Sequence, residues 1–288
     1  MFQRNFSLAQ VTSLGVGGPA DYFIQPSNVD EIILAQRFAL DKNLPLTIIG
    51  YGTNLLIRDG GIRGVVMRLA EPFAKAKVKS NFLTATTGCL FSSISKLALH
   101  HNLSGLEFAV GIPGGLGGAA FMNAGAYGGE IGPLIHEIEF VQNGEVGRWC
   151  KEDFSFSYRS SRIQKEQHMT IVSQVVLELL PTNKSIILEK MNDLQTQRRS
   201  KQPVEYPSAG STFKRPTGHY VGPLIEKAGL KGLRVGGAEV SCKHGGFLIK
   251  TGESRACDFL KLISIIQKEI LEQFSVELEP EIRILGED

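Results

Sequence analysis

The spacing of hydrophobic and polar residues predicts helices and strands that alternate along the chain. Residues 255–274 carry apolar side chains on one side at helical spacing, which predicts a long amphipathic helix. Ser27 is a good helix-capping residue and precedes acidic residues, so it predicts a helix that ends near residue 40. Further helices are expected over 92–101 and 185–199, and strands over 21–25, 46–50, 55–58, 64–68, 82–87, 135–142 and 170–180.

The end of the chain alternates strictly between apolar and charged residues over 276–284. A strand of period two would place Val276, Leu278, Ile282 and Ile284 on one face, and Glu277, Glu279, Glu281 and Arg283 on the other. Such an acidic face is usually a solvated sheet face, but one of its members could be a carboxylate of a site. The pattern leaves both interpretations open.

A glycine-rich segment interrupts this regular pattern. Residues 108–129 carry no charge and are long enough to span a bilayer, but they include eight glycines and Pro113. Each glycine costs a helix about 1 kcal/mol relative to alanine. We therefore expect no stable helix and no membrane segment here, but a loop-rich ligand site or tight core packing.

Length and composition narrow the class of protein. At about 150 residues per domain, 288 residues predict about two domains, and Pro181-Thr182-Asn183 is the clearest linker. The net charge of +2 gives no reason to expect nucleic acid or an anionic membrane as a partner. Four scattered cysteines and an N-terminus without a continuous apolar run favour a reduced, cytoplasmic protein. The histidines show no metal-ligand spacing, so no metal site is expected.

Two glycine turns are candidates for holding a phosphate. Residues 15–20 and 115–120 both fit the dinucleotide-binding pattern, but Pro19 falls where that helix would propagate, and no clear strand leads into Gly115. Glycine loops at 50–55 and 111–129 could still bring backbone N–H groups close to a pyrophosphate. A purely structural role, in which the glycines only permit a tight turn, explains either loop as well as a phosphate site does. Asn54 and Asn123 favour the ligand interpretation slightly.

Two polar segments offer side chains for chemistry. In residues 158–162, two arginines flank hydroxyls, a composition that by itself favours a solvated strand end. In residues 207–214, small residues are expected to expose the hydroxyls of Ser211 and Thr212 beside Lys214. This segment is not a nucleophile elbow, and a Ser-His-Asp triad has little support.

Seven segments occur together in one order along nearly the whole chain. They are residues 12–21, 50–64, 105–132, 156–162, 198–214, 224–232 and 278–286. In this combination the chain resembles the UDP-N-acetylenolpyruvoylglucosamine reductase family, in its shorter second subtype. The resemblance implies an α+β fold with two FAD-binding subdomains of the vanillyl-alcohol-oxidase (PCMH) type, at residues 1–65 and 66–182. A C-terminal α+β substrate-binding domain would follow at 183–288.

The family's activity sets the expected chemistry. The resemblance implies a flavoenzyme that binds FAD and uses NADPH to reduce the enolpyruvyl group of a UDP-linked amino sugar, in peptidoglycan precursor synthesis. A monomer is expected. An FAD-dependent oxidase on the same fold remains an alternative, as does a nucleotide-sugar-binding module without a redox role.

The resemblance also assigns residues. Arg159 and Glu281 would stabilise an enolate-like intermediate, and Ser211 would give a proton to C2. Tyr158, Arg199, Lys214 and Arg215 would contact the substrate. The residues expected to hold FAD are Tyr51, Gly52, Thr53, Asn54, Leu55, Gly111, Ile112, Gly115, Gly117, Gly118, Asn123, Ala124 and Gly125.

These residue types suit the chemistry. An arginine can clamp a carboxylate that gains charge, and a serine can protonate a strongly basic carbon in a closed site. One departure from the family pattern is Lys243-His244-Gly245-Gly246-Phe247, which stands where His-Ala-Asn-Phe is usual. Another is Arg215, which stands where asparagine is common.

Overall fold

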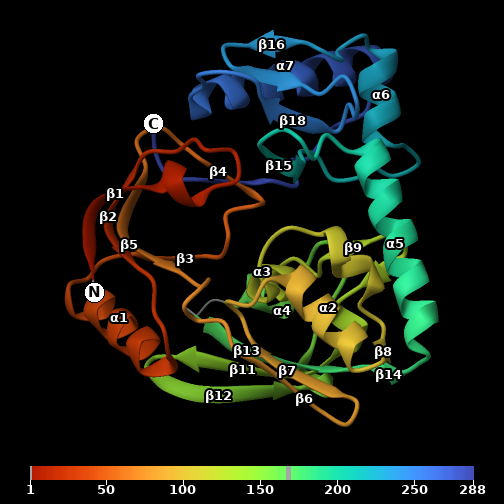
Figure 1. Cartoon of the computed structure of the whole chain (residues 1–288). Coiled ribbons are helices and arrows are strands. Elements are labelled where there is room, and N and C mark those ends of the chain that lie inside the picture. Colours follow the sequence, from red (N-terminus) through yellow and green to blue (C-terminus); the bar gives the residue numbers. More distant parts are fainter. Residues whose placement is uncertain (1, 167–169) are drawn as a thin grey trace. The chain divides into compact units, whose positions relative to one another are not determined.

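The computed structural model describes residues 2–166 and 170–288 (Figure 1). Its residues group into two compact units. The first comprises Met1–Gln3, Tyr22–Tyr51 and Gly64–Arg198. The second comprises Arg4–Asp21, Gly52–Arg63 and Arg199–Asp288. The division into three domains at residues 65 and 182 stays a prediction.

A five-stranded antiparallel sheet in the order β12-β11-β13-β7-β6 forms the centre of the first unit. Helices α2 and α3 bury their apolar side chains against it, including Phe91, Ile94 and Leu116. The elements of this layer are β6 (Ala76–Lys79), β7 (Phe82–Thr86), β11 (Ile135–Gln142), β12 (Glu145–Cys150), β13 (Thr170–Glu178), α2 (Phe91–His100), α3 (Leu116–Phe121) and α4 (Arg162–Lys165).

A second apolar cluster of the first unit joins α1 (Val29–Asp41) to β3 (Leu46–Ile49) and β5 (Ile62–Arg68). Strands β3 and β5 pair in parallel. They belong to a sheet in the order β1-β2-β5-β3, with β1 at Gln3–Ser7 and β2 at Pro19–Ile24. The chain passes from one unit to the other within β2 and within β5.

The second unit is built on a four-stranded sheet in the order β15-β18-β17-β16. The long helix α7 (Ala256–Phe274) buries Phe259, Leu262 and Ile266 in the core of this unit, and Figure 1 shows it beside β16 and β18. Strand β4 pairs in parallel with β19 at the end of the chain. The remaining elements of this unit are β4 (Leu55–Ile57), β15 (Ser208–Ser211), α6 (Val221–Lys227), β16 (Arg234–Val235), β17 (Ala238–Val240), β18 (Phe247–Lys250) and β19 (Arg283–Leu285).

Short elements complete the chain. Strand pairs β8–β14 and β9–β10 are antiparallel, and α5 contains the last residues of the first unit. Their bounds are β8 (Leu103–Ser104), β9 (Gly125–Ala126), β10 (Gly129–Glu130), β14 (Leu180–Pro181) and α5 (Lys184–Lys201), with 3-10 turns at Leu8–Val11, Glu107–Gly111, Gly132–Leu134 and Lys151–Asp153.

Three sequence expectations need correction. The cap of α1 is Asn28, whose side chain accepts a hydrogen bond from the Glu31 N–H, while the Ser27 hydroxyl bonds the Glu31 carboxylate. The glycine-rich segment does contain a helix, but α3 is only six residues long. The strand expected over 276–284 is wrong for most of its length, because β19 covers only Arg283–Leu285. Leu278 and Ile282 are nevertheless buried, as the alternation predicted.

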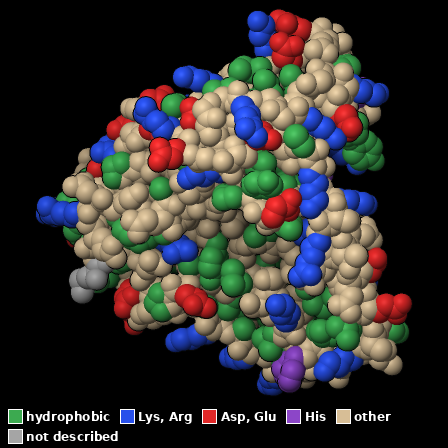
Figure 2. All heavy atoms as spheres, turned by 45° about the horizontal axis from the view of Figure 1, so that its top comes forward, with side chains coloured by type: hydrophobic (Ala, Val, Ile, Leu, Met, Phe, Trp, Pro, Cys, Tyr) green, Lys and Arg blue, Asp and Glu red, His purple; other side chains and the backbone are tan. Residues whose placement is uncertain are grey.

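The surface carries mixed charge. In the face drawn in Figure 2, Lys and Arg side chains lie among Asp and Glu side chains, in keeping with the net charge of +2. Among residues 2–166 and 170–288, no helix combines the length and the apolar character needed to cross a bilayer.

Candidate active site

The predicted site residues fall in both units. The first unit holds Tyr51, Tyr158, Arg159 and the predicted residues of the segment 111–125. The second unit holds Gly52, Thr53, Asn54, Leu55, Arg199, Ser211, Lys214, Arg215 and Glu281. The predicted cofactor residues are therefore divided between the units, as are the predicted catalytic residues.

Glycines let the segment 111–125 pack tightly in the first unit. A Cβ on Gly117 would lie 2.8 Å from the Cβ of Thr87, and one on Gly115 would lie 3.1 Å from Cδ2 of Tyr51. The Tyr51 hydroxyl donates a hydrogen bond to the Gly88 carbonyl at 2.9 Å, and burial raises the pKa of this phenol. A Cβ on Gly118, by contrast, would meet no atom within 4 Å. The segment is therefore closely packed at Gly115 and Gly117 and open at Gly118.

Arg159 lies in a tight turn of the first unit. Ser157 and Ser160 exchange backbone hydrogen bonds of 3.0 Å, and Arg159 takes φ of +55° between them. A left-handed backbone is uncommon for a residue with a side chain and is found preferentially at functional sites. The guanidinium donates to the Gly125 carbonyl at 3.2 Å and lies 5.1 Å from the ring centroid of Tyr158. The structure thus joins two predicted substrate-site residues to the glycine-rich segment.

Asn123 anchors this turn to the glycine-rich segment. Its side chain is 1% exposed, and its Nδ2 donates to the Ser157 carbonyl at 3.0 Å and to Glu130 Oε2 at 3.1 Å. Its Oδ1 accepts a hydrogen bond from the Gly132 N–H at 2.9 Å. The side-chain amide is therefore hydrogen-bonded within the protein through both its nitrogen and its oxygen. Any contact of Asn123 with a cofactor would have to come from its backbone.

A half-buried cation lies next to this segment, and its role was not predicted from the sequence. The side chain of Arg198 runs over Gly111, where an added Cβ would lie 2.7 Å from Cδ of Arg198. Burial lowers the pKa of this guanidinium. Within residues 2–166 and 170–288 the guanidinium has no hydrogen bond or carboxylate partner. A neighbouring residue, Arg199, was predicted to contact the substrate, and it is exposed. The pair Arg198-Arg199 was visible in the sequence, but the sequence did not show which of the two is half-buried.

In the second unit, Thr212 brings three predicted segments together. Its carbonyl accepts a hydrogen bond from the Glu281 N–H at 2.8 Å, and its side chain is 2% exposed. The Glu281 carbonyl in turn accepts a hydrogen bond of 3.2 Å from Asn54 Nδ2. The glycine loop 52–55, the Ser211 segment and the Glu281 segment are thus connected through backbone contacts. The expectation that the Thr212 hydroxyl is exposed was wrong, because Thr212 Oγ1 accepts a hydrogen bond from the Leu248 N–H.

Ser211 itself is placed as the sequence predicted. It ends β15 opposite Phe247 of β18, and its side chain is exposed. Its hydroxyl makes no side-chain hydrogen bond with any other described residue. Glu281 is half-buried. An exposed hydroxyl of this kind can give a proton to a bound molecule.

Lys214 and Arg215 continue from the same strand. The Lys214 ammonium forms an ion pair with the Glu279 carboxylate, and the Lys214 backbone N–H donates a hydrogen bond to the Glu279 carbonyl at 2.8 Å. The guanidinium carbon of Arg215 lies 3.9 Å from the ring centroid of Tyr220. Both side chains are therefore held by neighbours in the second unit.

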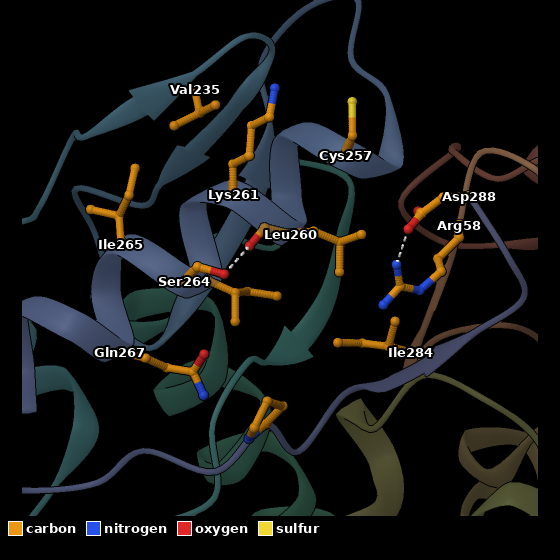
Figure 3. A pocket seen from close by; sticks show the side chains of 12 residues that line it. Arg58, Val235, Cys257, Leu260, Lys261, Ser264, Ile265, Gln267, Ile284 and Asp288 are labelled. Carbon is orange, nitrogen blue, oxygen red and sulfur yellow. Dashed lines mark hydrogen bonds and ion pairs between the residues drawn. The ribbon is translucent and has the colours of Figure 1, made fainter.

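Neither of the two hollows described for these units coincides with the predicted site as a whole. The larger, about 810 Å³, lies beside α7, and none of the predicted site residues lines it (Figure 3). A smaller hollow of about 330 Å³ in the first unit is lined by Asn123, Glu130, Lys151 and Phe156, among others. Asn123 is the one predicted site residue in its lining.

Comparison with known proteins identifies the family. The C-terminal domain of UDP-N-acetylenolpyruvoylglucosamine reductase matches residues 202–285, and an FAD binding domain matches residues 20–147. A UDP-N-acetylenolpyruvoylglucosamine reductase of Lactobacillus helveticus is 46% identical over 99% of this chain and 95% of its own length. The chain belongs to the UDP-N-acetylenolpyruvoylglucosamine reductase family.

Other members agree with this assignment. A family member from Clostridium novyi is 44% identical over 99% of this chain and 92% of its own length. A solved structure of the reductase from Thermus caldophilus superposes with a TM-score of 0.86, at 35% identity over 99% of both chains. The predicted α+β fold, with an FAD-binding region and a separate C-terminal domain, is confirmed.

Proposed function

We propose that this protein reduces the enolpyruvyl group of UDP-N-acetyl-3-O-(1-carboxyvinyl)-glucosamine to the lactyl ether, which gives UDP-N-acetylmuramate for peptidoglycan synthesis. NADPH is the proposed electron donor. The observation that carries the proposal is the match of 46% identity along the full length of a relative that bears the reductase name. The match to an FAD binding domain over residues 20–147 supports the cofactor.

Residues of the first unit fit FAD. Gly118 leaves open space beside a tightly packed glycine segment, and the Arg198 guanidinium next to Gly111 lacks an anionic partner among the described residues. A cation held in this way suits a diphosphate. We propose that Arg198 and the segment 111–125 hold the cofactor, together with Tyr51 and the loop 52–55. Bound FAD supplies the transfer of hydride between NADPH and C3 of the enolpyruvyl group.

Arg159 is the proposed partner of the substrate carboxylate. When C3 of the enolpyruvyl group is reduced, negative charge accumulates on this carboxylate, and a planar guanidinium can pair with both of its oxygens. The left-handed turn and the bond to the Gly125 carbonyl preorganise the side chain. Tyr158 and Arg199 are proposed substrate contacts beyond this group.

Ser211 is the proposed proton donor to the C2 carbon, and Glu281 is proposed to stabilise the enolate-like charge. The exposed Ser211 hydroxyl gives its proton to C2, which is basic enough to take it when the site excludes water. Glu281 would assist in stabilising the charge, and its backbone bond to Thr212 fixes its place relative to Ser211. Lys214 and Arg215 follow on the same segment and are proposed to contact the nucleotide-sugar.

The test is an anaerobic assay of NADPH oxidation on purified protein loaded with FAD. We expect NADPH consumption only when the enolpyruvyl nucleotide-sugar is added, with a product two mass units heavier than the substrate. An oxidase on the same fold would instead consume oxygen with an alcohol or sugar, and NADPH would not bleach its flavin quickly. A colourless protein that cannot be loaded with FAD would contradict both enzymatic functions.

A further inference from the structure

The turn between β17 and β18 contains a histidine whose ring binds the backbone of Gly246, the residue that pairs with the proton-donor segment. His244 is half-buried, and its Nδ1 accepts a hydrogen bond from the Gly246 N–H at 3.1 Å. Its ring lies edge-on to Phe247, with centroids 4.9 Å apart and an interplanar angle of 71°. A Cβ on Gly246 would lie 3.2 Å from Nδ1, so this close approach favours glycine at residue 246.

Two hydrogen bonds, one on each side of Gly246, connect this ring to Thr212. The Gly246 carbonyl accepts a hydrogen bond from the Thr212 N–H at 2.8 Å, and Thr212 directly follows Ser211. The Thr212 carbonyl accepts a hydrogen bond from the Glu281 N–H. Gly246, whose N–H His244 binds, is therefore one hydrogen bond away from Thr212, the residue that links Ser211 to Glu281.

The surroundings of His244 favour its neutral form. Burial lowers the pKa of His244, Lys231 adds to the lowering, and a hydrogen bond with its own backbone opposes it. Lys231 is paired with Glu226 of α6 at 3.0 Å. Gly222 of the same helix and Phe247 of β18 contact or flank the ring, and neither is titratable. Lys243, the preceding residue, directs its ammonium to the Arg199 carbonyl and to Glu205.

We propose that neutral His244 is a positioning residue for proton donation by Ser211. Its unprotonated Nδ1 accepts from the Gly246 N–H, the carbonyl of the same glycine accepts from the Thr212 N–H, and Thr212 is covalently joined to Ser211. This proposal rests on the proposed function of Ser211. Protonation of Nδ1 would set an N–H against the Gly246 N–H, so the bond would be lost and the segment released. The residue stands in the part of the chain that departs from the usual His-Ala-Asn-Phe pattern.

The experiment compares two variants and one control. His244→Asn keeps an oxygen that can accept from the Gly246 N–H and does not titrate, whereas His244→Ala removes the acceptor. His101→Asn, an exposed histidine of the first unit, is the matched control. Holoenzyme is reduced with NADPH and mixed with the enolpyruvyl substrate in a stopped-flow instrument between pH 5 and pH 8. Hydrogen exchange of the Gly246 and Thr212 amides is followed separately by NMR, without turnover.

We expect His244→Ala to slow this second half-reaction by roughly 3- to 10-fold at pH 8, as for the loss of one neutral hydrogen bond. Reduction by NADPH should be unchanged, and both amides should exchange faster. His244→Asn should restore most of the rate and the protection. The ratio of the wild-type rate to the His244→Asn rate should fall as the pH falls, because only the wild-type residue becomes protonated. The control should match the wild type.

The opposite results separate the two proposals. If His244→Ala keeps both rate and protection while Ser211→Ala is slow, the role of His244 is overturned and the function of Ser211 stands. If Ser211→Ala is as fast as the wild type, the donor assignment fails and this proposal fails with it. If His244→Ala and His244→Asn slow both half-reactions equally, the histidine supports folding and does not position the donor.

Discussion

Asn123 offers a sharp test of how the first unit holds the Arg159 turn. Asn123→Asp keeps the size of the side chain but replaces the Nδ2 donor with a carboxylate oxygen. That oxygen would face Glu130 Oε2, now 3.1 Å from Nδ2, and the Ser157 carbonyl, now 3.0 Å away. The Gly132 N–H would keep its acceptor. The substitution thus removes two hydrogen bonds and adds a like charge at a position that is 1% exposed.

The magnitude follows from these contacts. Each buried acceptor left without a donor costs roughly 1–3 kcal/mol. Because water can reach the exposed Ser157, its carbonyl should cost less than a fully buried acceptor. We therefore expect Asn123→Asp to lower the unfolding free energy by about 2–4 kcal/mol. Glu130→Gln alone should cost little, because its amide oxygen still accepts from Asn123. In the double variant, the amide introduced at residue 130 can donate to the carboxylate introduced at residue 123. This bond should recover about 1–2 kcal/mol, a coupling typical of residues in contact.

The assay is a double-mutant cycle by urea unfolding of the FAD-loaded protein, with the two half-reactions measured in parallel. Asn123→Asp should slow the step with the enolpyruvyl substrate more than the step with NADPH, because the Arg159 turn loses its anchor at Ser157. A variant as stable as the wild type would show that the two Asn123 Nδ2 hydrogen bonds do not stabilise this turn. So would a cycle without coupling between residues 123 and 130.

Three further predictions use single substitutions. Arg159→Lys should retain FAD and slow substrate reduction by roughly 100- to 1000-fold, measured by stopped flow, since lysine cannot make the planar, bidentate contact; an unchanged rate would remove Arg159 from the site. Arg198→Met should weaken FAD binding by roughly 10- to 100-fold in a fluorescence titration, as for a hydrogen bond to a charged group, while Arg199→Met serves as the exposed control; equal effects would contradict the assignment. Asp59→Ala should cost about 1 kcal/mol of stability at pH 7, because its carboxylate accepts from the Ala256 and Cys257 N–H groups at the start of α7. Burial alone would raise the pKa of Asp59, but these hydrogen bonds lower it. The carboxylate therefore stabilises the fold above its unfolded pKa of about 4, and this stabilisation should vanish as the pH falls through the folded pKa. A stability difference between Asp59→Ala and wild type that persists at lower pH would contradict this.

The sequence predicted regular elements where one periodicity dominated. The apolar stripe of α7 predicted 255–274, and the structure has Ala256–Phe274. The strand over 276–284 failed because alternation reports burial and does not report pairing. Pro280 has no N–H to give, and only residues 283–285 find a partner strand in β4. At α1, Ser27 and Asn28 are both capping types, and only the geometry showed that Asn28 binds the Glu31 N–H.

For the site, the resemblance suggested chemical roles but not the contacts that hold the site residues in place. The resemblance supplied roles for Arg159, Ser211 and Glu281, which stay predictions until they are tested. The hydrogen bonds that hold these residues in place join segments far apart in the sequence, so they could not be predicted from any one segment. Thr212 looked like a second exposed hydroxyl, yet its bonds to Leu248 and Glu281 bury it. Asn123 looked like a ligand for a phosphate, and its partners lie 7, 9 and 34 residues away along the chain.

The most direct test of the proposed function is the response of each half-reaction to Ser211→Ala. Reduction of the holoenzyme by NADPH requires no proton for the sugar, whereas completing the reduction of the enolpyruvyl group does. We expect anaerobic reduction by NADPH to keep its wild-type rate and reoxidation by the enolpyruvyl substrate to slow by roughly 100- to 10,000-fold. Ser211→Cys should recover part of the rate, because a thiol of similar size is a stronger acid. Equal slowing of both steps, or no slowing of the second, would show that Ser211 is not the proton donor.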